Sequence, residues 1–410
     1  MCKYKVANET DRIEAEDRGE AVTLMEPLIV QSQAKSREEL ADLALQLTAR
    51  STALRSSLPT GIVTALSHLV RSMNCYYSNL IEGHDTHPID IERALNEDFS
   101  HDPQQRDLQL EARAHINVQK WIDEGGLNEK ATTATGVLEM HHRFCSALPE
   151  ELLFIENPDS GERIKIISGE LRRQDVKAGR HVAISPGALP RFMTRFESAY
   201  ARLGNVDAIV ASASAHHRLL WMHPFLDGNG RVARLMSYAM LREELDTGGL
   251  WSIARGLARN VESYKSHLAN CDQPRRNDLD GRGHLSEEAL AEFAKFFITT
   301  CIDQVKFMEE LIQPNTLRSR IMNWAEDEIR RGTLPQKSDK VLEAVLYRGE
   351  LPRGGVSEIL NLSDRSARRI TSALLDIGVL TSASTRSPLH LAFPATLATR
   401  WMPGLFPDQS

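Results

Sequence analysis

The stretch HPFLDGNGRVAR, residues His223–Arg234, decides the fold expected for this chain. Upstream of it, Val206–Leu220 is rich in apolar and small residues and contains no glycine or proline, which predicts a largely buried helix. Pro224 and the Asp-Gly-Asn-Gly run then interrupt the helical pattern, and Arg231–Glu244 resumes it with an apolar stripe. The stretch therefore predicts two helices joined by a short loop that ends at a helix N-terminus.

The loop carries the residue types that bind phosphate groups. A helix start presents unpaired backbone N–H groups and the positive end of the helix dipole, and Gly228 and Gly230 allow an anion to approach the backbone closely. Asp227 is expected to bind a divalent cation, because Mg²⁺ prefers one or two carboxylates together with phosphate oxygens. Arg231 and Arg234 lie on one side of the following helix, where both can bind phosphate oxygens. The loop is therefore predicted to bind a nucleotide.

Two more residues of the stretch complete this prediction. The imidazole of His223 titrates near neutral pH and can take a proton from an attacking hydroxyl. Phe225 is expected to fix the loop to the core. Each signal alone has a structural alternative, since Gly-Asn-Gly is a common turn and a histidine beside a proline is usually structural. The complete pattern favours a catalytic loop.

The stretch resembles the signature of the Fic family, His-x-Phe-x-Asp/Glu-Gly-Asn-Gly-Arg-x-x-Arg. This resemblance covers about Met25–Leu317 and implies a mainly α fold with a small β-hairpin flap. It implies transfer of AMP from ATP to a hydroxyl of a target protein or of the chain itself, with His223 and Arg231 as catalytic residues and Mg²⁺ on Asp227. Gly230 favours nucleotidyl transfer, because kinases of the family carry lysine there. The ATP-binding residues implied are Gly228, Asn229, Gly230, Arg231, Arg234, Asn260 and Tyr264.

A second motif, SNLIEG, begins at Ser78 and ends a predicted helix that spans Ile62–Asn79, with Gly83 as its stop. It resembles the family's inhibitory pattern, Ser/Thr-x-x-x-Glu-Gly/Asn, placed N-terminal to the catalytic motif. By that resemblance Glu82 pairs with Arg234 and withholds this arginine from the γ-phosphate of ATP. A carboxylate–guanidinium pair is geometrically specific enough for such a role. The alternative is an ordinary helix end with an exposed glutamate.

A third segment, Gly169–Arg172 followed by Gly179–Pro186, resembles the family's flap, a β-hairpin that aligns the target by strand addition. Leu171 stands where the family usually has an aromatic residue. The alternative is a hairpin without that role. The residues expected at the target-binding edge are Val182, Ala183 and Ile184.

Asn260 and Tyr264 lie four residues apart, on one helix face, and resemble residues that many family members place near the adenine. The alternative is a polar pair on a helix surface. The paired histidines at His141 and His216 raise the alternative of a metal site, but no CxxC or HExxH pattern is present. Histidines that support the pocket or the core are therefore expected instead.

Length and composition bound the remaining choices. The 410 residues suffice for two or three domains, and the net charge of −7 argues against nucleic-acid binding by the whole surface. No apolar stretch reaches transmembrane length, Met1–Gly19 lacks the apolar core of a secretory signal, and the five cysteines are scattered. A cytoplasmic protein without a membrane partner is expected. The expected parts are a tail (1–24), a Fic domain (25–331, with the inhibitory helix around 62–83) and a C-terminal domain (335–410).

The C-terminal domain is predicted to be a winged helix-turn-helix that follows a hinge at Gly332–Gln336. Lys340–Tyr347 and Val356–Leu360 predict two helices, and Ser363 caps a third. The alternating pattern of Leu380–Phe393 predicts the wing. The apolar stripe of the third helix is expected to comprise Ala367, Ile370, Leu374 and Ile377. Its opposite face, with types suited to phosphate and base contacts, is expected to comprise Arg365, Arg368, Arg369, Thr371 and Ser372.

The partners of this domain stay open, since DNA, another protein and a second copy of the chain as a homodimer are alternatives. Three functions follow from the whole sequence. The first is a protein adenylyltransferase inhibited by Glu82, acting on a target that the sequence does not identify. The second is a DNA-binding transcriptional regulator that uses its Fic domain as a nucleotide sensor. The third is removal of AMP from a modified target. The intact set His223, Asp227, Asn229 and Arg231 favours catalysis.

Overall fold

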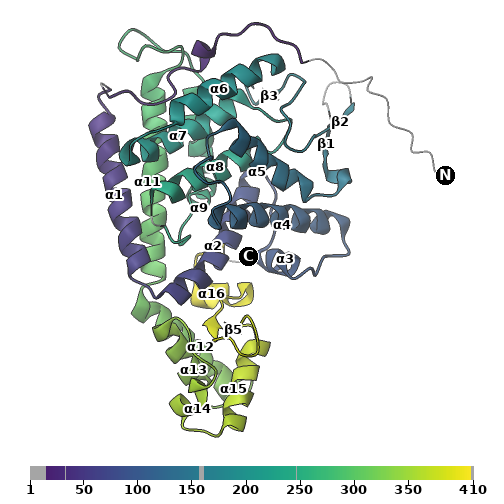
Figure 1. The fold of residues 1–410 in the computed structure, drawn as a ribbon, viewed down its shortest axis with the longest axis vertical. Helices are drawn as coiled ribbons and strands as arrows, with labels where there is room; N and C mark the ends of the chain where they lie inside the picture. The colour runs from purple at the N-terminus through teal and green to yellow at the C-terminus, as the bar shows by residue number, and fades with distance from the viewer. Residues whose placement is uncertain (1–14, 33, 157–160, 246, 408–410) are drawn as a thin grey trace, which may run out of the picture.

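A computed structural model of the chain describes residues 15–32, 34–156, 161–245 and 247–407. The expected fold, mainly α with small β-hairpins, is confirmed (Figure 1). The α-helices within the described ranges are α1 (Arg37–Ser56), α2 (Thr60–Ile81), α3 (Pro88–Leu95), α4 (Pro103–Asp123), α5 (Ala134–Ser146), α6 (Leu189–Tyr200), α7 (Asn205–Met222), α8 (Asn229–Glu244), α9 (Ala254–Arg259), α10 (Val261–Cys271), α11 (Glu287–Leu311), α12 (Pro314–Arg331), α13 (Ser338–Arg348), α14 (Gly355–Leu360), α15 (Asp364–Asp376) and α16 (Ala398–Trp401).

The strands form three two-stranded antiparallel sheets within the same ranges. They are β1 (Phe154–Glu156) with β2 (Arg163–Lys165), β3 (Lys177–Ala178) with β4 (His181–Val182), and β5 (Leu380–Thr381) with β6 (His390–Leu391). Short 3₁₀ helices are η1 (Val22–Met25), η2 (Glu150–Leu152), η3 (Pro186–Ala188) and η4 (Ala395–Leu397). No helix in the described residues is both long and apolar enough to cross a membrane.

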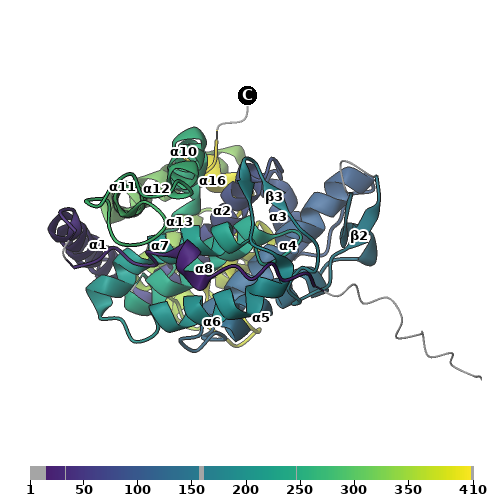
Figure 2. The same cartoon turned by 90° about the horizontal axis from the view of Figure 1, so that it is seen from above.

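Helices α7 and α8 pack against each other at the centre of the larger lobe, and α1, α2, α4, α5, α6 and α11 surround them (Figures 1 and 2). The predicted helix–loop–helix is confirmed. Helix α7 ends where His223 takes a left-handed conformation with φ of 50°, and α8 begins after Gly228, which has φ of 79°. The loop between them is therefore held by two buried helices, which fixes its position in the core.

Helix α2 runs from the junction with the smaller lobe up to this loop (Figure 1). It is two residues longer at its end than predicted, and it stops before Gly83, whose φ of 88° suits glycine. The N–H of His84 donates to the carbonyl of Asn79, which closes the helix end. The local sequence thus sets where the α2 terminus lies along the chain, and packing against α8 sets what it faces.

The N-terminal segment differs from a loose tail. Residues 1–14 lie outside the described part, but the residues just after them lie along the base of the β3–β4 hairpin. Arg18 forms an ion pair of 2.7 Å with Asp175, which precedes β3. The carboxylate of Glu20 accepts hydrogen bonds from the backbone N–H and the hydroxyl of Ser185, which follows β4. The segment from Glu16 to Glu20 therefore ties down both ends of this hairpin.

The smaller lobe contains α12–α15 and the β5–β6 hairpin, with α16 at the junction (Figure 1). Helix α12, expected in the preceding domain, packs against α13 and α16. The lobe is in close contact with α2, because Gly61 lies directly against the backbone of Gly349 and the hydroxyl of Tyr77 donates to the carbonyl of Leu405 over 3.1 Å. The segment Gly332–Gln336 is thus a turn between packed helices.

Two residues of the predicted third helix differ in exposure from the prediction. Thr371 is 6% exposed, and its hydroxyl donates to the carbonyl of Ala367 one turn earlier, so this polar side chain fits the buried face. Ile377 is 36% exposed because α15 ends at Asp376, and a residue beyond the last turn no longer follows the helical stripe. The other predicted stripe residues, Ala367, Ile370 and Leu374, are buried.

Candidate functional site

His223 lies at the end of α7 in a form that can accept a proton. Its Nδ1 lies 3.3 Å from the carbonyl oxygen of Leu220, which accepts only from a protonated Nδ1 and leaves Nε2 as the basic nitrogen. Burial lowers the pKa of His223 to about 4, although the bond to Leu220 opposes this shift. The imidazole is therefore neutral at pH 7 and available as a general base.

The start of α8, called the cradle below, has the unpaired backbone N–H groups that the sequence predicts for a phosphate-binding loop. Within the described residues, the backbone N–H groups of Asn229, Gly230 and Arg231 donate to no protein acceptor. They belong to the first turn of α8, where the helix dipole also favours an anion. These groups can therefore bind a phosphate without displacing an existing backbone hydrogen bond.

The side chain of Asn229 forms two hydrogen bonds within this loop. Its side-chain oxygen accepts from the N–H of Phe225 over 3.0 Å, and its side-chain nitrogen donates to the carbonyl of Phe225 over 2.8 Å. Phe225 is fully buried and stacks on His141 with ring centroids 3.8 Å apart. The amide of Asn229 thus closes the loop and shapes the cradle, and the peg expected at Phe225 is confirmed.

Arg234 is bound by the end of α2. Its Nε donates to the hydroxyl of Ser78 over 2.8 Å, and its Nη2 lies 2.5 Å from a carboxylate oxygen of Glu82. Burial raises the pKa of Glu82, but the Arg234 guanidinium more than offsets this, so the pKa lies below its ordinary value. The same carboxylate oxygen lies directly over Gly230, where a Cβ atom would collide with it. Glu82 therefore occupies space next to the cradle.

Arg231 is bound by a carboxylate that the sequence analysis missed. Its Nη2 lies 2.7 Å from Glu111 on α4, and the same carboxylate oxygen lies 2.8 Å from Nδ1 of His84. This contact with Glu111 raises the pKa of His84. Glu111 and His115 lie one turn apart on a buried face of α4, so a polar pair in an apolar stripe was the signal that could have identified this contact.

Asp227 lies at the mouth of the loop. Its side chain is 57% exposed, and its nearest charged partner is Arg231, with an Nη1–Oδ2 distance of 3.9 Å. A carboxylate that is exposed beside a phosphate cradle and makes no close ion pair fits the requirements of Mg²⁺. The donor set present at the loop is therefore compatible with the expected metal.

Arg172 joins the loop to the β3–β4 hairpin. It is 3% exposed, and its guanidinium donates to the carbonyls of His223 (2.7 Å), Gln174 (2.9 Å) and Ile184 (2.6 Å). Its backbone N–H donates to the carbonyl of Pro224. The segment that resembles the flap therefore has a structural link to the proposed base.

The hairpin edge contains one exposed side chain of the three expected there. Val182 is 64% exposed, whereas Ala183 and Ile184 are buried. The N–H of Ala183 and the carbonyl of Ile184 are already bonded, to Val176 and Arg172. Val182 is therefore the residue of this set that a peptide could contact through its side chain.

The side chains of Tyr264 and Asn260 have different hydrogen-bond partners, and neither bonds to the other in the described chain. Tyr264 is buried, its hydroxyl lies 2.6 Å from Nε2 of His216, and burial raises its pKa to about 12, while the nearby Arg234 lowers it. The side chain of Asn260 donates to the carbonyl of Gly256 between α9 and α10. Tyr264 thus lies beside Arg234 on the side of α10, and the side chain of Asn260 bonds to α9.

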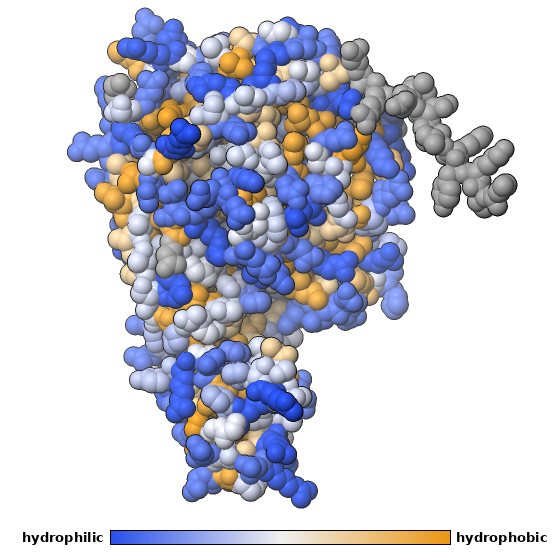
Figure 3. All heavy atoms as spheres, viewed as in Figure 1, coloured by the Kyte–Doolittle hydropathy of each residue, from blue (hydrophilic) through white to orange (hydrophobic). Residues whose placement is uncertain are grey.

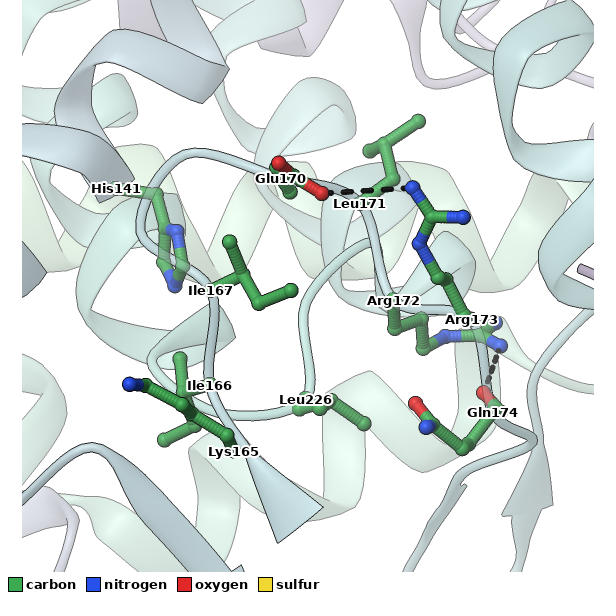
Figure 4. A pocket seen from close by; sticks show the side chains of 10 residues that line it. All are labelled: His141, Lys165, Ile166, Ile167, Glu170, Leu171, Arg172, Arg173, Gln174 and Leu226. Carbon is green, nitrogen blue, oxygen red and sulfur yellow. Dashed lines mark hydrogen bonds and ion pairs between the residues drawn. The ribbon is translucent and has the colours of Figure 1, made fainter. Parts of the chain in front are cut away.

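Two cavities lie near these helices in the described part of the chain, and neither coincides with the cradle. A cavity of about 50 Å³ lies between Leu226 and Arg172 (Figure 4). It is too small for a nucleotide, since ligand pockets measure about 300–1,000 Å³. A groove of about 640 Å³ lies at the opposite ends of α2 and α8, around Ser67 and Arg242. At the cradle itself, the carboxylate of Glu82 lies over Gly230.

Comparison with known proteins identifies the part of the chain that carries this loop. Residues 131–241 match the family described as Fic/DOC. The chain contains a Fic domain. The "Protein adenylyltransferase Fic" of Drosophila willistoni is 32% identical over 128 residues, which cover 30% of this chain and 22% of that protein. The protein of the same name from Drosophila grimshawi is 29% identical over 168 residues, 40% of this chain and 32% of that protein.

The alignments thus span about a fifth to a third of these relatives. A solved structure of a Fic family protein from Desulfovibrio desulfuricans G20 has a TM-score of 0.52 at 16% identity and covers 89% of this chain and 98% of that one, which shows a similar fold. The residues matched to the Fic domain include α5, the β3–β4 hairpin, α7 and most of α8. Glu82 and Glu111, which bind the two arginines of the Fic motif, lie outside them.

Proposed function

We propose that this chain transfers AMP from ATP to a hydroxyl side chain of a target protein or of itself, and that Glu82 restrains this activity. The observation that carries the proposal is a neutral His223 beside unbonded N–H groups at the start of α8. The named adenylyltransferases that share the Fic domain support the same reaction. Gly230 is consistent with transfer of a nucleotidyl group.

In the proposed reaction, Nε2 of His223 takes the proton of the attacking hydroxyl. The hydroxyl oxygen forms a bond to the α-phosphorus of ATP, and the bond from that phosphorus to the bridging oxygen breaks, which releases pyrophosphate. The backbone N–H groups of α8 stabilise the charge on the phosphate oxygens, and Arg231 neutralises the leaving group. Arg231 is positioned for this by its ion pair with Glu111.

Asp227 is the residue that would hold Mg²⁺. When bound, the ion neutralises phosphate charge next to the cradle. The chain's own contribution is an exposed carboxylate held at the loop mouth by Gly228 and the start of α8.

The proposed restraint acts through Arg234. Because Glu82 and Ser78 occupy its guanidinium, Arg234 cannot bind the γ-phosphate in the same state. The carboxylate over Gly230 also repels a phosphate that enters the cradle. ATP must therefore displace Glu82 or bind in a pose that does not align the α-phosphorus with His223.

The test compares AMP incorporation from labelled ATP by the wild-type chain and by Glu82→Gly, with Mg²⁺ and a cell lysate. We expect at least tenfold more labelling with Glu82→Gly, and a loss of at least about 100-fold when His223→Ala is added, as is typical for removal of a general base. Glu124→Gly is a matched control, because Glu124 also caps a helix and also precedes a glycine, but its carboxylate is exposed and lies 3.9 Å from Lys120.

Equal labelling by the wild type, Glu82→Gly and Glu124→Gly would refute the restraint. Labelling that survives His223→Ala would refute the assigned base. A complete lack of labelling by Glu82→Gly, on itself and on every protein of the lysate, would refute adenylyl transfer.

A further inference from the structure

The far end of the smaller lobe carries a group of unusual arginines. Arg365, Arg368 and Arg369 are exposed on α15, and Arg386 is exposed in the turn between β5 and β6. Among the described residues, none of these four guanidiniums forms an ion pair or a hydrogen bond. Figure 3 shows hydrophilic side chains gathered at this end of the lobe.

Several other arginines of the lobe form ion pairs. On α12, Arg318 pairs with Glu343, Arg330 with Asp327 and Arg331 with Glu328. Arg400 at the junction also pairs with Asp327, over 2.7 Å. Carboxylates are thus abundant in the lobe, but they lie away from the exposed middle of α15.

The arginines of α15 make no ion pair or hydrogen bond in the described chain that would stabilise the fold. Arg365 lies three residues before Arg368 and four before Arg369, and like charges at these spacings repel on a helix surface. The helix is stabilised from its other side, by the apolar stripe that includes Ile370, and from its start, by the hydroxyl of Ser363. A cluster that costs helix stability and has no partner within the described chain points to a partner outside it.

We propose that this face binds duplex nucleic acid, with α15 in the major groove and the β5–β6 turn along the phosphate backbone. The three helices α13, α14 and α15 followed by a hairpin have the order of a winged helix-turn-helix, in which the last helix enters the groove. Helices α14 and α15 lie at the end of the molecule most distant from the Fic domain, so the described chain leaves their approach open (Figure 1).

The charges on α15 and in the β5–β6 turn indicate which residues contact the nucleic acid. Asp376 lies at the C-terminal end of α15 and repels phosphates there, so the contact is expected in the N-terminal half of the helix, from Arg365 to Arg369. In the turn, the backbone and hydroxyl groups of Ser384 and Ser387 lie beside Arg386 and suit a phosphate contact. A helix and a turn that both present cations match a groove and its flanking backbone. The overall charge of −7 makes the attraction local.

The test measures fluorescence anisotropy of a labelled mixed-sequence duplex of about 20 base pairs, two helical turns, titrated with the full-length chain at several salt concentrations. We expect affinity that falls steeply with salt, because bound cations on the duplex are released. The triple variant Arg365→Ala, Arg368→Ala, Arg369→Ala is expected to lose at least tenfold in affinity, and the slope of log K against log salt to fall by about three.

The double variant Arg330→Ala, Arg331→Ala is the matched control, since these arginines are exposed in the same lobe but ion-paired, and it is expected to bind as the wild type does. Thermal unfolding of all variants is the control that tests whether the lobe stays folded. The proposal is overturned if the wild type shows no salt-dependent binding at low salt, or if the triple variant binds equally well. It is also overturned if polyglutamate of equal charge displaces the duplex, since the face then fits an acidic protein.

This inference is independent of adenylyl transfer. His223→Ala removes the proposed base, which lies in the other lobe, and is expected to leave duplex binding unchanged. A chain that binds the duplex without transferring AMP would refute the enzymatic proposal alone, and a chain that transfers AMP without binding the duplex would refute this one alone.

Discussion

In and around the Fic loop, Arg172, Arg231 and Arg234 are each at most 5% exposed, and each donates to acceptors on other elements. On α15, the guanidiniums of Arg365 and Arg368 are exposed and have no such partners among the described residues. Arginine side chains are therefore buried and hydrogen-bonded in the first region, and exposed and, within the described chain, unpaired in the second.

The difference follows from the cost of removing a charge from water. A buried guanidinium without acceptors would destabilise the fold by several kcal/mol, so the loop arginines must be paired before any ligand arrives. A ligand at the loop therefore has to displace Glu82, whereas a ligand at α15 displaces only water and ions. Under the two proposals, folding therefore restrains the first region, whereas the second region is ready to bind at once.

The largest effect is expected from low pH, which should destabilise the larger lobe more than the smaller one. Burial lowers the pKa of five histidines of the larger lobe, all to about 3 or 4. Their pKa in the unfolded chain is about 6.5, so the unfolded state binds more protons, and the free energy of unfolding falls as the pH drops from about 6.5 towards 4. Each histidine contributes at most about 1.4 kcal/mol per pH unit. They are His115, His141, His216, His217 and His223.

Urea unfolding at pH 7.5, 6.5 and 5.5 measures this effect, and hydrogen exchange locates it. Between residues 335 and 410 the sequence has one histidine, His390, so the amides of α15 should keep their protection to lower pH than those of α7. Stability that is constant from pH 7.5 to 5.5 would show that the buried imidazoles tolerate a proton, contrary to their burial.

Removal of Arg172 is expected to have the second largest effect. Arg172→Ala leaves the carbonyls of His223, Gln174 and Ile184 without their donor in a buried position, which we expect to lower the free energy of unfolding by about 3 kcal/mol. The same change should lower AMP transfer by the Glu82→Gly chain, since the loop loses its link to the hairpin.

The matched control is Arg173→Ala. Arg173 is the next residue, is partly exposed, and lies 3.5 Å from Glu170, so its removal should cost less than about 1 kcal/mol. Chemical unfolding of both variants measures the difference. Equal losses would show that backbone acceptors in the loop do not depend on a buried guanidinium.

The smallest effect is expected on α15. Arg368→Ala removes repulsion with Arg365 and loses no contact within the described chain, so the free energy of unfolding should change by no more than about 0.5 kcal/mol. Thermal unfolding without nucleic acid measures it. A loss above about 1 kcal/mol would show that Arg368 has a stabilising partner in the folded chain and would narrow the contrast between the two regions.

Local patterns in the sequence predicted the elements of the site well. The limits of α7 and α8 follow from apolar periodicity and from Pro224 and Gly228, and the end of α2 follows from Gly83. Such signals act within one or two helical turns, so the printed sequence contains them in full. The same is true of the cap at Ser363, whose hydroxyl accepts from the backbone three residues later.

Contacts between distant segments were harder to predict. Glu111 meets Arg231 because α4 packs beside α8, and the sequence alone does not give the rotation of one helix against another. Asn229 was assigned to phosphate by resemblance, and its local bonds to Phe225, four residues earlier, emerge only from the closed loop. Thr371 is polar, so the outer face was predicted for it. Its hydroxyl instead donates to the carbonyl of Ala367, which allows the side chain to be buried.

The glycine contact between the lobes has a practical consequence. Gly61 and Gly349 touch through their backbones, and several turns further along α2 the rings of Tyr76 and Phe406 pack edge to face with centroids 5.7 Å apart. A protein truncated at Pro335 would expose this aromatic surface of α2 to water and invite aggregation. Assays of the proposed activity should therefore use the intact chain. Truncation would expose apolar surface on α2, the same helix whose C-terminal end carries Glu82.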